Sequence, residues 1–323
     1  QNPYWIENRI QSKETRTRVI LALSASFKVN NWLTIQARGN MDYWSDKLRQ
    51  QFYASTATAL CGANGRYIEM DYQETQMYGD IMAMFKKTWG DFTLDAAIGG
   101  SINDRVTNST RYDSKNASLH FANVFNIANI VMNSSASIDQ KIDAHRQLQS
   151  LFGTAQIGYK EKIFLDLTAR NDWASTLSHT THEKSGFAYP SAGLSILLDK
   201  WVKMPEWVSF AKLRGAYSKV GNDIPPHITN PSSHVNAGGE MQANDAAPFR
   251  EMEPEMTHAI EFGTEWRFFQ HRLGVNLTYY RTNTYNQFFK LPALAGDVFA
   301  FRYVNAGNIQ NRGWEVTLNA TPV

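Results

Sequence analysis

Apolar and polar side chains alternate with a period of two along much of this chain. Within residues 31–43, one parity carries apolar or small residues: Leu33, Ile35, Ala37, Gly39, Met41 and Tyr43. The other parity carries polar residues: Thr34, Gln36, Arg38, Asn40 and Asp42. Because successive side chains of a β-strand point to opposite faces, this pattern predicts a strand with one apolar and one polar face.

The same alternation recurs in eleven segments, which predicts an all-β fold. Consecutive segments form hairpins; the first two, for example, are separated only by a short turn near residues 28–31. The predicted strands are 18–28, 31–43, 77–85, 92–100, 153–159, 163–172, 192–198, 211–217, 260–268, 273–279 and 301–320.

The connections between these strands alternate strictly between short and long. Short turns follow the odd strands, and long polar segments follow the even ones. The long segments are 44–76, 102–150, 174–188, 221–254 and 291–300. All long loops therefore project from one end of the sheet, as in outer-membrane barrels, where apolar faces meet lipid and polar faces line a lumen. The pattern predicts an antiparallel transmembrane β-barrel with long extracellular loops and short periplasmic turns.

Two further features of the strands bear on this prediction. Aromatic residues recur beside the short turns, which is typical of a membrane-interface girdle, although any single ring is equally compatible with an ordinary protein core. Bacterial barrels normally take an even number of antiparallel strands. About eleven strands are therefore expected to be part of a larger barrel, with both ends of the chain as internal cuts.

The composition narrows the classes of protein to which this chain can belong. The chain has 323 residues, of which 43% are hydrophobic and 19% charged, so a folded protein is expected. Its formal charge of +2 is too balanced for a nucleic-acid binder, and the single Cys61 cannot form an internal disulfide. No run of Val, Ile, Leu, Met, Phe or Ala exceeds five residues, whereas a spanning helix needs roughly 20 apolar residues. Transmembrane helices are excluded, but membrane residence is not.

Several motifs from residue 151 onward are similar to those of a known family. They are RNDWASTL at 170–177, YPSAGLS at 189–195, KLRGAYSKVGND at 212–223, EPE at 253–255, EFGTE at 261–265, NLTYY at 276–280 and VNAGNIQNRGWE at 304–315. In order and spacing they resemble the barrel of the SusC/RagA-type TonB-dependent outer-membrane transporters of Bacteroidetes. Residues 1–150 support the resemblance mainly through NPYW at 2–5 and the strand pattern.

The resemblance implies a barrel of about 22 strands filled by a plug domain. It implies active import of a nutrient, a glycan or a peptide, with energy supplied through TonB and a SusD-like surface lipoprotein as partner. The expected location is the outer membrane of a Gram-negative, Bacteroidetes-like bacterium. Residues 1–323 are then expected to be part of one barrel domain, with the plug and the remaining strands outside the chain.

Transport requires weak polar and aromatic contacts along a lumen and no nucleophile. The candidate substrate or lumen residues are Arg38, Asp42, Trp44, Arg170, Asp172, Trp173, Arg214, Asn222 and Asp223. The alternative for the charged members is structural pairing along adjacent strands or contact with the plug. Loop aromatics equally fit a sugar ring or the lipoprotein.

No enzyme chemistry is expected from this sequence. His179 and His182 lie in a Thr-rich loop with only Glu183 nearby, so no metal site is expected, and no cofactor-binding fingerprint or nucleophile motif occurs. The row Glu251, Glu253 and Glu255 fits a solvated or lumen-facing edge better than a glycosidase pair. Two other functions stay open at this point: a soluble secreted carbohydrate-binding or carbohydrate-cleaving β protein, and a passive porin.

Overall fold

One antiparallel sheet of eleven strands dominates the computed structural model, which describes residues 2–133, 136–222, 224–235 and 239–321. Its strand order follows the chain, β1-β2-β3-β4-β5-β6-β7-β8-β11-β12-β13. The strands are β1 Ile10–Lys28, β2 Leu33–Phe52, β3 Arg66–Trp89, β4 Phe92–Asp113, β5 Ser137–Tyr159, β6 Ile163–Ala174, β7 Phe187–Leu197, β8 Val208–Asn222, β11 Glu255–Phe268, β12 Leu273–Pro292 and β13 Phe301–Ala320. The predicted all-β fold and the eleven strands are confirmed.

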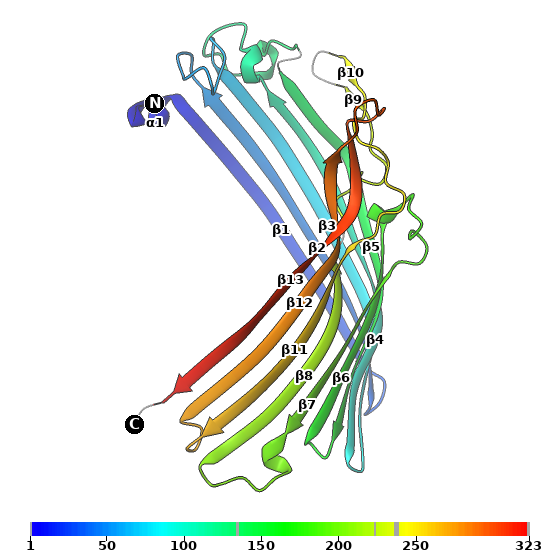
Figure 1. Cartoon of the computed structure of the whole chain (residues 1–323). Helices are drawn as coiled ribbons and strands as arrows, with labels where there is room; N and C mark the ends of the chain where they lie inside the picture. Colours follow the sequence, from blue (N-terminus) through cyan, green and yellow to red (C-terminus); the bar gives the residue numbers. More distant parts are fainter. Residues whose placement is uncertain (1, 134–135, 223, 236–238, 322–323) are drawn as a thin grey trace.

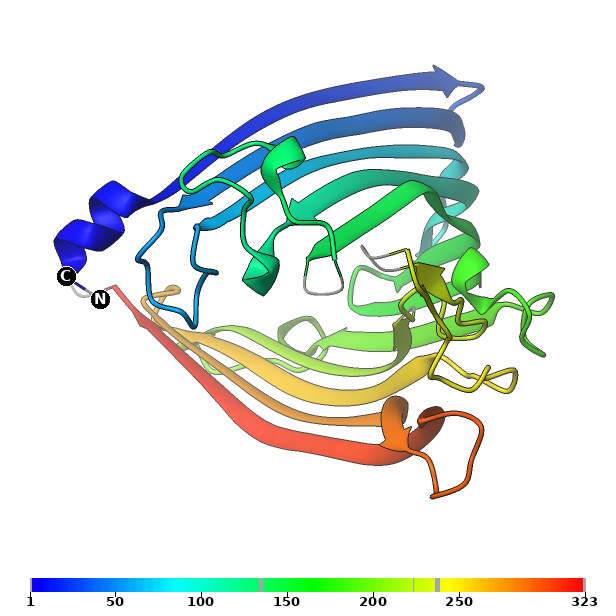
Figure 2. The ribbon, with the colours of Figure 1, turned by 90° about the horizontal axis from the view of Figure 1, so that it is seen from above.

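The sheet curves into an open trough, with β1 and β13 as its two edges (Figures 1 and 2). Neighbouring strands are antiparallel throughout, so the first and the eleventh strand run in the same direction. An antiparallel sheet of this count cannot close by pairing its own edges antiparallel. The structure is therefore an open part of a barrel wall.

Strand register assigns each side chain to one of two faces. Arg38 lies opposite Asp80 on β3, and Asp80 lies opposite Ser101 on β4, so these polar residues share one face. Carboxylates on that face are buried: Asp80 is 7% exposed and Glu74 is 1% exposed. Large apolar side chains on the other face are open, with Leu23 80% and Phe262 59% exposed. In a curved sheet the side chains on the concave side are crowded together and are less exposed than those on the convex side. The polar face, whose carboxylates are buried, is therefore the concave one.

The convex face carries an apolar band of nearly constant height. On β12 it includes Leu273, Val275, Leu277 and Tyr279, and Arg281 then ends it. The strands themselves run to 24 residues, whereas a strand needs about 9–11 residues to cross a bilayer. The outer halves of the long strands therefore continue beyond the band.

Aromatic rings gather at the short-turn end of the sheet, as predicted. Trp32 and Phe85 stack with ring centroids 6.1 Å apart, and Phe92 and Tyr159 lie 5.0 Å apart. Trp207 packs on Phe268 at 5.6 Å. These rings lie beside the short turns, which are all at the same end of the trough. They therefore form one aromatic rim at that end.

The long-loop end departs from the sequence prediction. Strand β2 continues to Phe52 and β3 begins at Arg66, so the predicted 44–76 loop shrinks to 53–65. Likewise β4 and β5 leave only 114–136 of the predicted 102–150 loop. Between the apolar band and the long loops, both faces of the strands are polar. The alternation of apolar and polar residues therefore stops there, although the strands remain hydrogen-bonded to one another.

The loops pack into two clusters at this end. The first loop cluster, from 53–65 and 114–136, buries Leu119 and Ile130 against Tyr67, and Asn64 Nδ2 donates to the Leu119 carbonyl at 2.8 Å. The second loop cluster joins 175–186, 224–235, 239–254 and 293–300. Its buried residues are Leu177, Ile224, Ile228 and Met252. The Ala247 amide donates to the Phe301 carbonyl at 2.9 Å, which ties the 239–254 loop to the start of β13.

Minor elements complete the fold. They are the helix α1 Pro3–Arg9, the 3-10 turns η1 Lys115–Ala117, η2 Ile127–Asn129, η3 Ser175–Leu177 and η4 Leu198–Lys200, and the hairpin β9 His234–Val235 with β10 Met241–Gln242. Among the described residues, no helix has both the length and the apolar character needed to cross a membrane.

Candidate functional site on the concave wall

Arginine–carboxylate pairs line the concave wall between neighbouring strands. Arg18 on β1 donates to both oxygens of Asp42 on β2, at 2.9 and 2.5 Å. Arg38 on β2 donates from Nε to both oxygens of Asp80, at 3.1 and 3.0 Å. Register places each pair on adjacent strands, and two-oxygen contacts of this kind fix the planar guanidinium. Asp42 and Arg38 thus lie on the concave face, each with a structural partner.

Trp44 forms an aromatic platform on the same wall. Its ring stacks on Tyr72 of β3 with centroids 6.5 Å apart and an interplanar angle of 28°. The Arg18 guanidinium carbon lies 5.9 Å from the Trp44 ring centroid. The ring is half-buried, between two carboxylates that are both held by arginines: Asp42, and Asp46, which accepts from Arg16 at 2.6 and 2.7 Å. The concave wall therefore presents a positioned ring and fixed charges together.

Sequence reasoning missed a buried carboxylate beside this platform. Glu74 accepts from Arg105 and Thr107 of β4 and from the Tyr72 hydroxyl. Glu74 and Arg105 fell within segments predicted as loops. No sequence signal marked these two residues, because charged residues beyond the apolar band occupy both parities, as Glu69, Asp71 and Glu74 do. Together, Trp44, Tyr72 and the partners of Glu74 give the β1–β4 wall its densest polar network.

A second group of candidates lies on β6. Arg170 donates to Asp172 at 2.6 Å and to the Ser150 hydroxyl at 2.7 Å, all on the concave face. Trp173 has the opposite parity, which it shares with Leu165 and Leu167, so it lies on the convex face. The sequence prediction had placed it on the lumen side, and that placement is wrong. Its indole nitrogen donates to the Lys184 carbonyl at 3.1 Å. One residue of register separates a lumen position from an outward one.

Arg214 and Asn222 lie on β8. Arg214 donates to the Thr278 hydroxyl at 2.6 Å and lies 3.4 Å from a Glu261 oxygen. It lies flat across Gly263, where a Cβ would be only 2.5 Å from the Arg214 Nε. Asn222 is exposed at the end of β8, opposite Glu255. Asp223 lies outside the described residues. The structure therefore spreads the candidates over three parts of the wall and does not gather them in one pocket.

The described residues of the concave wall present polar groups but no gathered set of metal ligands. Within the described residues, no cluster of three His, Cys, Asp or Glu side chains forms a metal site. His182 Nε2 lies 3.7 Å from a Glu253 oxygen in the second loop cluster. The wall instead offers paired charges, hydroxyls and one stacked indole.

Comparisons with known proteins agree with this geometry. A family model described as "TonB dependent receptor-like, beta-barrel" matches residues 1–321. A TonB-dependent receptor of Formosa agariphila is 31% identical over 189 residues, covering 55% of this chain and 18% of that receptor. A second receptor of the same organism is 25% identical over 185 residues, covering 54% of this chain and 17% of its own length.

Solved structures show the same fold. The RagAB peptide transporter structure superposes with a TM-score of 0.82 at 18% identity, covering 99% of this chain and 36% of that chain. The ferric-catecholate import receptor Fiu of Escherichia coli K12 superposes with a TM-score of 0.56 at 12% identity, covering 98% of this chain and 46% of that chain. At these identities the likeness is one of fold alone, and the chain spans less than half of each structure.

Proposed function

Because the chain belongs to the TonB-dependent receptor-like β-barrel family, we propose that it forms part of the wall of an active importer in a bacterial outer membrane. The family expected from the sequence motifs is confirmed by the match over residues 1–321. The proposed location is the outer membrane of a Gram-negative, Bacteroidetes-like bacterium, in keeping with the Formosa relatives.

One observation carries the proposal: a sheet with an exposed apolar convex band and a paired-charge concave wall. In water, exposed side chains such as Leu318 (68% exposed) and Val316 (62%) would form an unusually large apolar surface. In a bilayer the same residues meet acyl chains, while the polar face lines a water-filled lumen. The half-buried rings at the short-turn end then lie at the inner interface.

The proposed cargo is an oligosaccharide or a peptide. The RagAB complex, whose fold this chain shares, is described as a peptide transporter. On this chain, we place solute contacts at Trp44 and at the charged residues Arg38, Asp42, Arg170, Asp172 and Arg214, with Asn222 at the outer end. Paired charges present fixed donors and acceptors without a strong net field, which suits weak, repeated contacts with an uncharged or mixed-charge solute.

The proposed partners follow from the family. A plug domain would fill the lumen, TonB would supply energy, and a SusD-like surface lipoprotein would meet the long-loop end. The two packed loop clusters support the last assignment, because they present a preorganised surface and not a set of loose connections.

Two experiments test the proposal. The intact protein, expressed in an outer-membrane host, should move faster on a gel before boiling in detergent than after it. Cells should take up a fluorescent oligosaccharide or peptide only when TonB is present. Uptake that survives TonB removal would favour a passive porin, and recovery of folded protein without detergent would favour a secreted carbohydrate-binding protein.

A further inference from the structure

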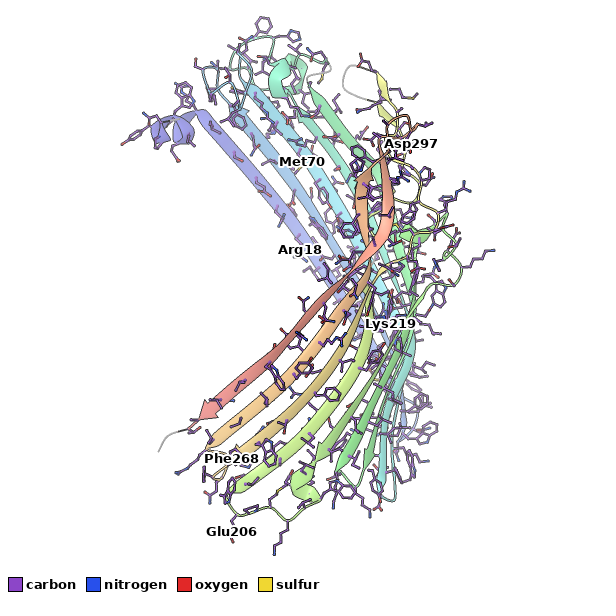
Figure 3. The ribbon with its side chains drawn as sticks, in the orientation of Figure 1. Arg18, Met70, Glu206, Lys219, Phe268 and Asp297 are labelled. Atoms are coloured by element: carbon purple, nitrogen blue, oxygen red, sulfur yellow. The ribbon has the colours of Figure 1, made fainter. Side chains whose placement is uncertain are left out.

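Four basic side chains lie together on the convex face, just above the apolar band. They are Lys219 on β8, His258 on β11, Arg281 on β12 and Arg312 on β13. Register places His258 opposite Lys219 and Arg312 opposite Arg281. Figure 3 shows Lys219 far up the wall from Phe268, which marks the short-turn end. We call these four residues the basic patch.

Among the described residues, no carboxylate on the convex face of these four strands balances the basic patch. The described convex positions of these four strands, odd residues 211–221 and 273–285 and even residues 256–268 and 308–320, include no Asp or Glu. The polar partners that the structure gives them are neutral: Arg281 Nε donates to the Asn283 amide oxygen at 3.1 Å, and His258 Nδ1 lies 2.9 Å from the Tyr217 hydroxyl. Arg281 and Arg312 are both exposed.

The charge excess is specific to this side of the wall. On β1 to β3, the corresponding convex positions beyond the band carry Lys13, Lys47 and Arg49 beside Glu69 and Asp71. There, Arg49 Nη2 lies 3.1 Å from a Glu69 oxygen. Like charges directly opposite each other in a sheet are destabilising. The Arg281–Arg312 arrangement therefore suits a position where an anion from outside the described chain lies between them.

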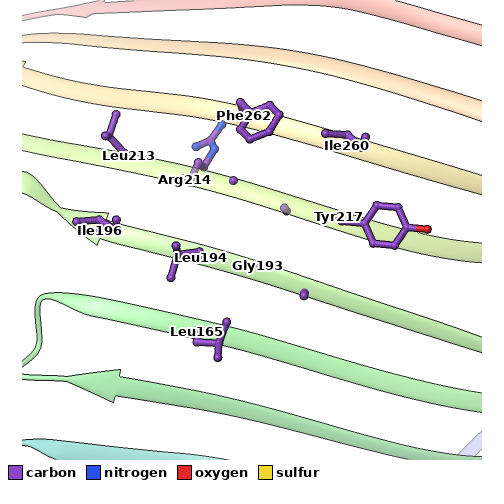
Figure 4. Close-up of a pocket in the computed structure, with 12 residues that line it drawn as sticks. Leu165, Gly193, Leu194, Ile196, Leu213, Arg214, Tyr217, Ile260 and Phe262 are labelled. Atoms are coloured by element: carbon purple, nitrogen blue, oxygen red, sulfur yellow. The ribbon is translucent and has the colours of Figure 1, made fainter.

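Directly below the basic patch the surface becomes aromatic and then apolar. Tyr279 and Trp314 lie one step down the same strands, with ring centroids 4.9 Å apart. Beside them a groove of about 510 Å³ crosses β6, β7, β8 and β11, with Leu194, Leu213 and Phe262 among its lining residues (Figure 4). Cations above, rings between and an apolar groove below match a phosphate headgroup and its acyl chains.

We infer that the basic patch and the groove bind a phosphorylated lipid of the outer leaflet, with one phosphate at the Arg281–Arg312 pair and a second one toward Lys219. This inference rests on the proposed placement of the chain in an outer membrane. Guanidinium groups bind phosphate through two parallel hydrogen bonds, and an acyl chain in the groove would hold the headgroup at the patch. The proposal concerns one defined lipid-binding site on the convex face. It does not concern the non-specific lipid shell that surrounds any membrane barrel.

The test uses native mass spectrometry of the intact protein in detergent micelles that contain diphosphoryl lipid A, monophosphoryl lipid A or phosphatidylcholine. The test variant combines Lys219→Gln, Arg281→Gln and Arg312→Gln. The matched control combines Lys13→Gln, Lys47→Gln and Arg49→Gln, on the charge-balanced side. A charge-retaining variant combines Lys219→Arg, Arg281→Lys and Arg312→Lys.

The wild-type protein should retain diphosphoryl lipid A best and phosphatidylcholine least. The test variant should bind diphosphoryl lipid A at least about tenfold more weakly, while the control keeps most of the affinity. The charge-retaining variant should fall between the two, because lysine keeps the charge but not the two parallel hydrogen bonds of a guanidinium group. Equal retention by test variant and wild type, or an equal loss in the control, would overturn the inference. Displacement of the lipid by millimolar inorganic phosphate alone would also overturn it, because the groove would then contribute nothing.

The gel-mobility assay separates this inference from the proposed function. A wild-type protein that shows the heat-dependent shift but no preference among the lipids refutes the lipid site and leaves the importer proposal standing. A protein that never enters the membrane refutes both. The same assay confirms that the test variant has folded before its lipid content is compared.

Discussion

Arg18 holds Asp42 through two hydrogen bonds while its guanidinium also lies over the ring of Trp44. One arginine on the edge strand β1 thus positions both a carboxylate and an indole on β2. The consequence is an aromatic platform whose position is set by the charged side chains beside it.

Replacing Trp44 with Ala is expected to weaken uptake without preventing barrel assembly. Aromatic contacts of this kind contribute about 0.5–1.5 kcal/mol, so the KM for the transported solute should rise roughly 2- to 10-fold. The measurement is concentration-dependent uptake by cells with equal amounts of heat-shifted barrel. Trp173→Ala is the matched control, because Trp173 lies on the convex face and should leave KM unchanged. An equal rise in both variants would show that the platform does not meet solute.

Charge should be tolerated on one face of β8 and not on the other. Leu213→Arg places a cation in the apolar band and is expected to cost about 2–4 kcal/mol, whereas Ala216→Arg adds it to the concave wall opposite Glu261. The fraction of protein in the outer membrane that shows the heat-dependent gel shift should fall for Leu213→Arg and stay near wild type for Ala216→Arg. The reverse order would invert the assignment of the faces.

Asp113 at the end of β4 anchors the first loop cluster. Arg66 donates to both of its oxygens at 2.8 Å, and Arg111 donates a third hydrogen bond at 2.8 Å. Burial by itself raises the pKa of this carboxyl group, but the hydrogen bonds from Arg66 and the Lys115 amide outweigh burial and hold the pKa of Asp113 below its ordinary value.

A carboxyl group with a depressed folded-state pKa stabilises the fold above its unfolded pKa of about 3.9 and loses that contribution as pH falls through the folded value. The first loop cluster should therefore open only at pH below about 4. Asp113→Asn should destabilise it at neutral pH by roughly 3 kcal/mol, because Arg66 loses its buried partner. Hydrogen exchange of residues 114–133 is the measurement. Asp91→Asn removes only the exposed pair with Lys160, so a comparable effect there would contradict this account.

Gly186 is expected to be irreplaceable in the loop between β6 and β7. Its φ is +62°, and a Cβ would lie 2.5 Å from the Asp172 carbonyl oxygen. Gly186→Ala must therefore shift the backbone next to Asp172 and should cost about 1–3 kcal/mol. Gly296 also has a positive φ, +94°, but with no atom within 4 Å of its Cβ position, so Gly296→Ala should cost less. Protease sensitivity of the two loops decides between these expectations, and equal sensitivity would argue against the contact with Asp172.

Residue alternation determined the strands within the apolar band, their order and the two faces. Those features follow from local physics, because a strand half in lipid and half in water needs one apolar and one polar side. The short turns and their aromatic rim were predictable for the same reason. Arg38 and Asp42 were assigned to the polar face by parity alone.

Only the tertiary structure decided where the strands end, which charges pair and which way the terminal residues of a strand face. Beyond the band both faces meet water, so nothing in the sequence marks where β2 or β4 stops, and Glu74 and Arg105 were hidden in segments predicted as loops. The face on which Trp173 lies could be assigned only from the register of β6, because Trp173 and its neighbour Asp172 point to opposite faces. Arg281 and Arg312 are far apart in sequence and become neighbours only through the pairing of β12 with β13. Alternation is a property of one strand, whereas the pairs that make a wall depend on register between strands.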